Sequence, residues 1–201
     1  FAAEPIFFNQ FKQSNAKTVY SLMMQVFILF GLGIFLFVTL HIDSIKLIIV
    51  NPLYHQGLVI IPIILMANIF LGIYYNLSVW YKVTNRTIYA AYISLLGSLV
   101  TIGANLIMIP IFGYLGAAWT TLGCYIIMTL VSYWLGARHY RVKYNIYTIL
   151  RYFIITFSIF YVSKIFNSSW YINIQIDNTI LFFIYTIFIY LEVQQILKKN
   201  K

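Results

Sequence analysis

The chain has 201 residues, of which 62% are hydrophobic and 8% charged, and its formal net charge at pH 7 is +9. So few charged residues cannot cover a water-soluble globule of this length, since about a quarter of the residues in an average soluble domain are charged. The Lys and Arg residues lie in small groups between long apolar stretches and do not alternate with exposed aromatic residues, which excludes a nucleic-acid-binding surface.

Six apolar stretches are each long enough to cross a bilayer, which takes roughly 20 residues of helix. In chain order they are Val19–Leu40, Leu58–Trp80, Ile88–Ile111, Leu115–Leu135, Tyr147–Ile165 and Thr179–Leu197. Continuous apolar sequence predicts helices and not barrel strands, because a lipid-exposed segment must satisfy its own backbone hydrogen bonds. We therefore predict an all-α fold, a polytopic transmembrane helix bundle of about six spanning helices. The last two stretches differ from the others in carrying a charged residue near one end, Arg151 and Glu192 respectively.

The connecting segments predict the orientation, because short cytoplasmic loops hold most of the Lys and Arg residues of a membrane protein. Basic and poorly charged segments alternate along the chain. With the six stretches as spans, eleven of the thirteen Lys and Arg residues lie on one side, and only Lys46 and Lys164 lie on the other. We expect a multi-pass membrane protein with both ends of this chain in the cytoplasm.

The third stretch carries small residues at four-residue steps, which places them on one face of a helix. Ala90, Ser94 and Ser98 form this stripe, with Gly97 and Thr101 beside it. Small side chains let two helix backbones approach closely in lipid, so we expect another helix to pack here.

Polar residues at membrane depth are costly and therefore face a cavity or another helix. Asn68 and Asn76 are eight residues apart in the second stretch, within about 80° of one another around a helix. Together with Tyr75 they are candidates to line a hydrophilic path, and hydrogen bonding between neighbouring helices is the equally weighted alternative.

We predict no catalytic, cofactor-binding or metal-binding residues, and no enzymatic activity. The three His residues lie at the edges of loops without a ligand spacing, the acidic residues are scattered singly, and Cys124 lies alone inside an apolar stretch.

Three passages resemble the C-terminal part of Wzx-like polysaccharide biosynthesis flippases, members of the multidrug/oligosaccharidyl-lipid/polysaccharide exporter superfamily. They are AEPIFF at 3–8, ANIFLGIYYNLSVWYK at 67–82 and NLIMIPIFGYLGAAWTTL at 105–122. The third is similar to the family's turn between two helices, in which an Asn stands five residues before a Pro and a Gly-x-x-Gly-Ala-Ala sequence follows. The likeness covers most of residues 1–150, and its motifs are structural.

The resemblance implies that the chain is the C-terminal portion of a longer protein, a MATE-like C-terminal lobe plus two extra helices. Residues 1–18 would be the cytoplasmic end of a preceding helix and a loop. Residues 19–138 would form four transmembrane helices of the lobe, and residues 139–201 two further helices and a basic cytoplasmic tail.

The resemblance implies a protein of the bacterial inner (plasma) membrane that translocates a lipid-linked oligosaccharide across it by alternating access. The cargo would be a polysaccharide repeat unit, as of lipopolysaccharide O-antigen, on an undecaprenyl-pyrophosphate-type carrier. Membrane lipid and other polysaccharide assembly proteins would be further partners, and no nucleic acid is expected. Glu4, at the mouth of the cavity, joins Asn68, Tyr75 and Asn76 as a candidate substrate-cavity residue.

Two alternatives remain open at this stage. A drug or metabolite exporter of the same fold would couple transport to an acidic residue at mid-depth, which the six stretches lack. A polytopic membrane enzyme of polysaccharide assembly would need a large polar outer loop or paired catalytic side chains. The longest external segment, residues 41–57, offers only His41, Asp43, Lys46 and His55. A purely structural or assembly subunit is a further reading, since fold does not dictate function.

Overall fold

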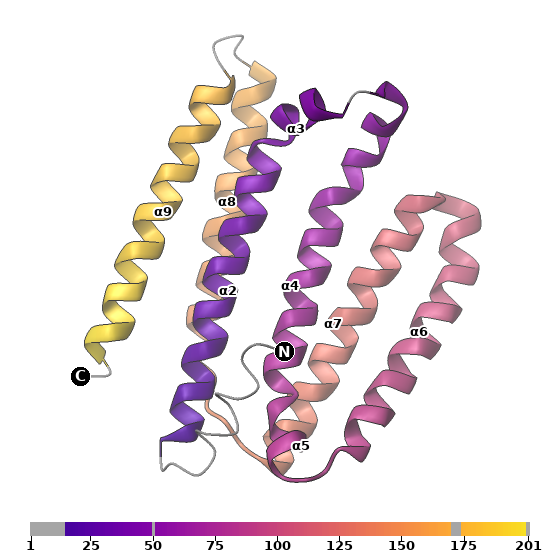
Figure 1. Ribbon diagram of the computed structural model, residues 1–201, viewed down its shortest axis with the longest axis vertical. Helices are drawn as coiled ribbons and strands as arrows, with labels where there is room; N and C mark the ends of the chain where they lie inside the picture. Colours follow the sequence, from indigo (N-terminus) through magenta and orange to yellow (C-terminus); the bar gives the residue numbers. More distant parts are fainter. Residues whose placement is uncertain (1–14, 50, 170–173, 200–201) are drawn as a thin grey trace. The chain divides into compact units, whose positions relative to one another are not determined.

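The computed structural model describes residues 15–49, 51–169 and 174–199, and all regular structure in these residues is helical (Figure 1). The elements are α2 (Ala16–Leu40), α3 (Ile42–Ile48), the 3-10 helix η1 (Pro52–Ile60), α4 (Ile61–Leu77), α5 (Val79–Val83), α6 (Ile88–Phe112), α7 (Tyr114–His139), α8 (Ile146–Ser169) and α9 (Ile174–Lys199). The prediction of an all-α fold is confirmed.

Six helical segments in the described residues are long and apolar enough to cross a membrane. They are Ala16–Leu40, Tyr54–Val83, Ile88–Phe112, Tyr114–His139, Ile146–Ile165 and Asn178–Ile196. Each overlaps one of the six stretches predicted from sequence. Many of their large apolar side chains point away from the protein, such as Leu99 and Leu106 of α6, which are 65% and 73% exposed. Such a surface is stable in hydrocarbon and not in water, so the chain is a polytopic membrane protein.

The chain divides into two compact units. Unit 1 comprises residues 1–24 and 63–145, so its described part holds the first turns of α2, nearly all of α4, and α5, α6 and α7. Unit 2 comprises residues 25–62 and 146–201, with the rest of α2, α3, η1, α8 and α9. The predicted ranges 1–18, 19–138 and 139–201 group α2 with α4 to α7, whereas most of α2 belongs to the same compact unit as α8 and α9.

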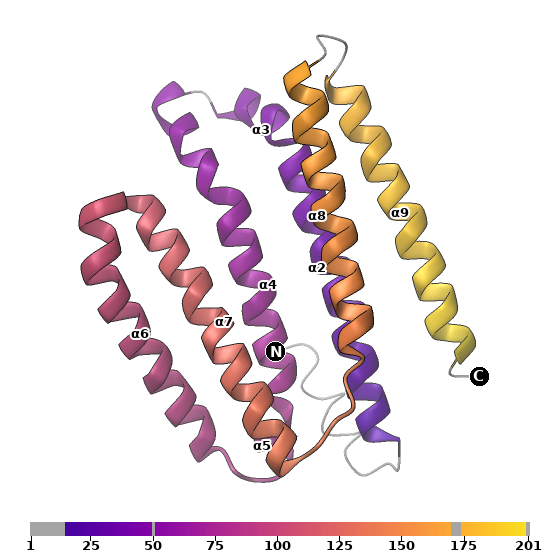
Figure 2. The same cartoon turned by 180° about the vertical axis from the view of Figure 1, so that it is seen from behind.

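An antiparallel hairpin of α6 and α7 forms one side of unit 1, and the two helices lie side by side in both views (Figures 1 and 2). The hairpin turns at Gly113, which adopts a φ of 57° that residues with a side chain rarely take. Three residues later Gly116 lies against the backbone of α6, where a Cβ would overlap the carbonyl group of Met108. Both glycines of the predicted Asn-x4-Pro…Gly-x-x-Gly motif are therefore required by the turn.

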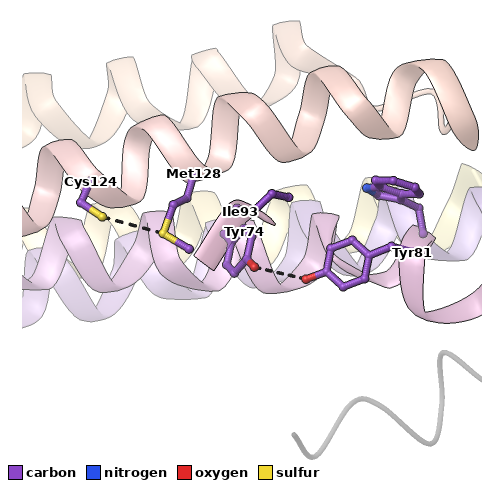
Figure 3. Close-up of a cluster of buried hydrophobic side chains, with 6 residues drawn as sticks. Tyr74, Tyr81, Ile93, Cys124 and Met128 are labelled. Atoms are coloured by element: carbon purple, nitrogen blue, oxygen red, sulfur yellow. Dashed lines mark hydrogen bonds between the residues drawn. The ribbon is translucent and has the colours of Figure 1, made fainter. Parts of the chain in front are cut away.

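The core of unit 1 is aromatic and sulfur-rich. Its buried members are Tyr74, Trp80, Tyr81, Ile93, Cys124 and Met128. The hydroxyls of Tyr74 and Tyr81 lie 3.2 Å apart, and the Cys124 thiol points toward Met128 (Figure 3). The same thiol donates to the carbonyl of Gly97 at 3.3 Å, and a Cβ at Gly97 would be 2.6 Å from the Met128 sulfur.

The close contact of α6 therefore lies at Gly97, and the expected stripe is only partly correct. Ala90 packs against the core, but Ser94 and Ser98 are exposed, and the Ser98 hydroxyl donates to the carbonyl of Ser94 in its own helix. The hydroxyls can bond to the preceding turn, so these serines do not need a partner helix.

Unit 2 contains a hairpin of α8 and α9, which lie side by side in both views (Figures 1 and 2). Polar side chains join the hairpin to α2. The Tyr185 hydroxyl, completely buried, donates to the carbonyl of Leu29 at 3.3 Å. The Asn178 amide donates to the carbonyl of Leu40 at 2.7 Å and accepts from the Ser163 hydroxyl at 2.7 Å. These bonds cross between helices where lipid offers no substitute partner.

Candidate functional site

The candidate site predicted from sequence lies on α4, whose inner face is fixed by contacts within unit 1. The buried residues of this helix are Met66, Ala67, Ile69, Ile73, Tyr74 and Leu77. The Thr129 hydroxyl of α7 donates to the carbonyl of Phe70 at 3.0 Å, which holds the two helices in register. The opposite face of α4 is consequently kept in a defined orientation.

Asn68 and Tyr75 lie on that opposite face and are exposed, Tyr75 by 50%. They are seven residues apart, so about two turns of helix bring them to nearly the same side. Asn76 is half-buried at the edge of this face. The structure thus brings together the three described candidates on one helix, and their role as cavity residues stays a prediction. Glu4 lies outside the described residues.

Both amides are partly satisfied by their own helix. The Nδ2 group of Asn68 donates to the carbonyl of Ile64 at 2.8 Å, and that of Asn76 donates to the carbonyl of Gly72 at 3.0 Å. Each bond uses one of the two N–H groups, so the amide of Asn68 retains donor and acceptor capacity on the exposed face. Such a face suits a ligand rich in hydroxyl groups.

A second polar group, in unit 2, was not predicted as a site. The Glu192 carboxylate of α9 is buried, accepts a hydrogen bond from the Arg151 guanidinium of α8 at 2.5 Å, and accepts another from the Tyr152 hydroxyl at 3.0 Å. The Arg151 side chain is 43% exposed, so the ion pair lies at the surface of the hairpin on its arginine side. The sequence could have indicated this pair. Arg151 lies near the start of one predicted span and Glu192 near the end of the next, and two such positions meet in an antiparallel hairpin.

One turn further along, the same hairpin continues in polar contacts. The Thr156 hydroxyl lies 2.8 Å from the carbonyl of Tyr152 and 3.3 Å from the hydroxyl of Tyr185. The Tyr152 hydroxyl bonds to α9, the Thr156 hydroxyl bonds to Tyr185 of α9, and the Tyr185 hydroxyl bonds to α2, so the arrangement is suited to holding the three helices together.

The histidines have local partners. His41 bonds to the carbonyl of Phe37, His55 to that of Ile49, and His139 to that of Leu135. His139 also stacks on Trp80, with ring centres 5.3 Å apart and planes 10° from parallel. No three His, Cys, Asp or Glu residues of the described part of the chain gather as a metal ion would need.

No protein-family model, curated protein or solved structure matches the chain. The helices alone define its class, a multi-pass α-helical membrane protein.

Proposed function

We propose that the chain is part of a membrane flippase that moves a lipid-linked oligosaccharide, on an undecaprenyl-pyrophosphate-type carrier, across the bacterial inner membrane. Other polysaccharide assembly proteins would act with it. The proposal combines a polytopic helical fold with the sequence resemblance to Wzx-like exporters.

The observation that carries the proposal is the hairpin of α6 and α7. The glycines of the motif shared with that family occupy positions where the backbone requires them, since Gly113 has a positive φ and Gly116 touches the backbone of Met108. A motif that meets a specific steric need is a better sign of common architecture than an apolar composition, which any membrane helix has.

The exposed face of α4 also fits the proposal, because it carries Asn68 and Tyr75 together. The amide-bearing face of α4 would meet the glycan, because exposed amide groups at membrane depth can exchange hydrogen bonds with sugar hydroxyls.

The test is deletion of the gene that encodes the protein, followed by extraction and mass spectrometry of lipid-linked repeat units. The proposal predicts intact repeat units that accumulate accessible only from the cytoplasmic leaflet, and restored export when the gene is returned. Normal export in the deletion strain would rule the proposal out.

A further inference from the structure

The charged residues of unit 1 are distributed very unevenly. Its described residues hold six Lys and Arg and no Asp or Glu, and the one acidic residue of the unit, Glu4, lies outside them. The six, here called the basic end, are Lys17, Lys82, Arg86, Arg138, Arg141 and Lys143.

All six stand at or next to the ends of the apolar helices of unit 1 that are long enough to span a membrane. They occupy the start of α2, the end of α5, the connection to α6, and the end of α7 with the segment after it. Figures 1 and 2 show α5, the start of α6 and the end of α7 at the same end of this unit. Two contacts join the start of α2 to the segment after α7. The Lys17 ammonium lies 4.7 Å from the centre of the Tyr140 ring, and the Ser21 hydroxyl donates to the carbonyl of Lys143 at 3.1 Å.

A small cavity opens within this end. It has a volume of about 20 Å³, and Tyr20, Trp80, Gly136, Tyr140 and Tyr144 are among its lining residues. The volume suffices for one water-sized group, such as a single phosphate oxygen. All lining residues belong to unit 1.

Trp80, one of the lining residues, carries an unused hydrogen-bond donor. Its side chain is 3% exposed, and its Nε1 has no hydrogen-bond partner. The Nε1 edge faces Gly136, where a Cβ would stand 3.2 Å from the nitrogen. A buried N–H without an acceptor is costly, so the site is complete only when an acceptor enters.

Phenol groups also line the cavity. Burial raises the pKa of Tyr140, and burial together with the neighbouring Tyr140, Tyr133 and Tyr20 raises the pKa of Tyr144. Both phenols therefore keep their protons at neutral pH. A cavity lined by neutral phenols, with the Lys17 ammonium over one of them, suits an oxygen-rich anion.

We propose that the cavity and basic end of unit 1 bind the phosphate headgroup of an anionic membrane lipid. One phosphate oxygen would accept from Trp80 Nε1, and Lys17, which lies over the lining residue Tyr140, would neutralise the charge. Location at the end of membrane-spanning helices favours a lipid over a soluble anion, because the acyl chains can remain beside the apolar surface of the spans. The proposal is independent of the flippase assignment.

The test uses the purified full chain in vesicles of equal parts phosphatidylglycerol and phosphatidylcholine, released in mild detergent. Native mass spectrometry then counts the lipids retained. Wild type should retain phosphatidylglycerol in preference to phosphatidylcholine. Lys17→Gln, at an exposed position, should weaken this retention about fivefold. Trp80→Phe removes the N–H together with part of the indole that stacks on His139, and should weaken the retention about tenfold.

The matched control is Lys198→Gln, which removes the same charge from an exposed position in unit 2. It should leave the retention unchanged. Equal retention by the Lys17→Gln, Trp80→Phe and Lys198→Gln proteins would overturn the site, because nonspecific attraction would then account for all binding. Displacement of phosphatidylglycerol by inorganic phosphate at equal concentration would assign the cavity to a soluble anion and overturn the lipid proposal. If Trp80→Phe does not fold, the comparison of phosphatidylglycerol retention by Lys17→Gln and Lys198→Gln tests the site, and equal retention by these two would overturn it.

Discussion

Two charged residues, one in α8 and one in α9, form an ion pair inside the hairpin. Arg151 and Glu192 are unfavourable in hydrocarbon one at a time, yet in an antiparallel hairpin they reach the same level and neutralise each other. The Tyr152 hydroxyl satisfies the second carboxylate oxygen. The carboxylate is therefore buried with both oxygens bonded, which is the condition under which such a pair is tolerated.

Replacement of one partner should be worse than replacement of both. Arg151→Met leaves the Glu192 carboxylate buried without its cation and should lower the free energy of unfolding by about 2 kcal/mol. This is less than the 3 to 5 kcal/mol typical of fully buried pairs, because Arg151 is 43% exposed. The measurement is chemical unfolding in detergent micelles, followed by circular dichroism.

Two further variants complete this test. The double replacement Arg151→Met with Glu192→Met should recover most of the loss, since no uncompensated charge remains. Arg86→Met, at an exposed position before α6, is the control and should change little. A double variant as unstable as the single one would show that the pair does not act as described.

The sequence identifies polar residues within the spans but does not identify the side chains that they contact. Asn68, Tyr75 and Asn76 could be chosen as polar residues in an apolar helix, and the structure puts the first two on one exposed face of α4. Glu192 could not be assigned to Tyr152 and Arg151, because composition gives the ends of the spans but not which helices lie side by side. For the same reason, the sequence could not predict the hydrogen bond from the Tyr185 hydroxyl to α2.

At the scale of the elements, the hairpin of α6 and α7 depends on glycines that differ in what surrounds them. Gly116 touches the backbone of the facing helix, and Gly97 receives the flexible side chain of Met128. Gly123, on the same helix as Gly116, has nothing within 4 Å of the position where a Cβ would stand. The sequence alone cannot rank these three positions.

Gly116→Ala should therefore destabilise the hairpin, because backbone cannot move aside as a side chain can. We expect a loss of about 1 to 3 kcal/mol in the free energy of unfolding, measured in detergent micelles. Gly123→Ala is the matched control and should be neutral or slightly stabilising, since Ala has the higher helix propensity. Equal stability of the two variants would mean that α6 and α7 do not approach each other at Met108.

The elements that the sequence predicted well are those that lipid alone dictates. Length and apolar composition located all six spans, because the bilayer sets both. The predicted contact stripe on α6 included Ser94 and Ser98, whereas the close contact lies at Gly97. The sequence could not predict this, because the face of α6 that meets α7 depends on how Met128 and Cys124 pack.

At the scale of the whole molecule, the account rests on six crossings that leave most cations on one side of the membrane. The structure supplies the helices, and the distribution of Lys and Arg supplies the orientation as a prediction. Helix length says nothing of direction, so the two parts of the argument are independent.

The most direct measurement is labelling of single cysteines in intact cells with a maleimide that cannot cross the membrane. Cys124 is buried and is first replaced by alanine, and single cysteines are then introduced at the exposed positions Asn51 and Arg141. The account predicts that the cysteine at position 51 reacts in intact cells and the one at position 141 only after the cells are permeabilised. Reaction of the cysteine at position 141 in intact cells would contradict the topology and, with it, the proposed direction of transport.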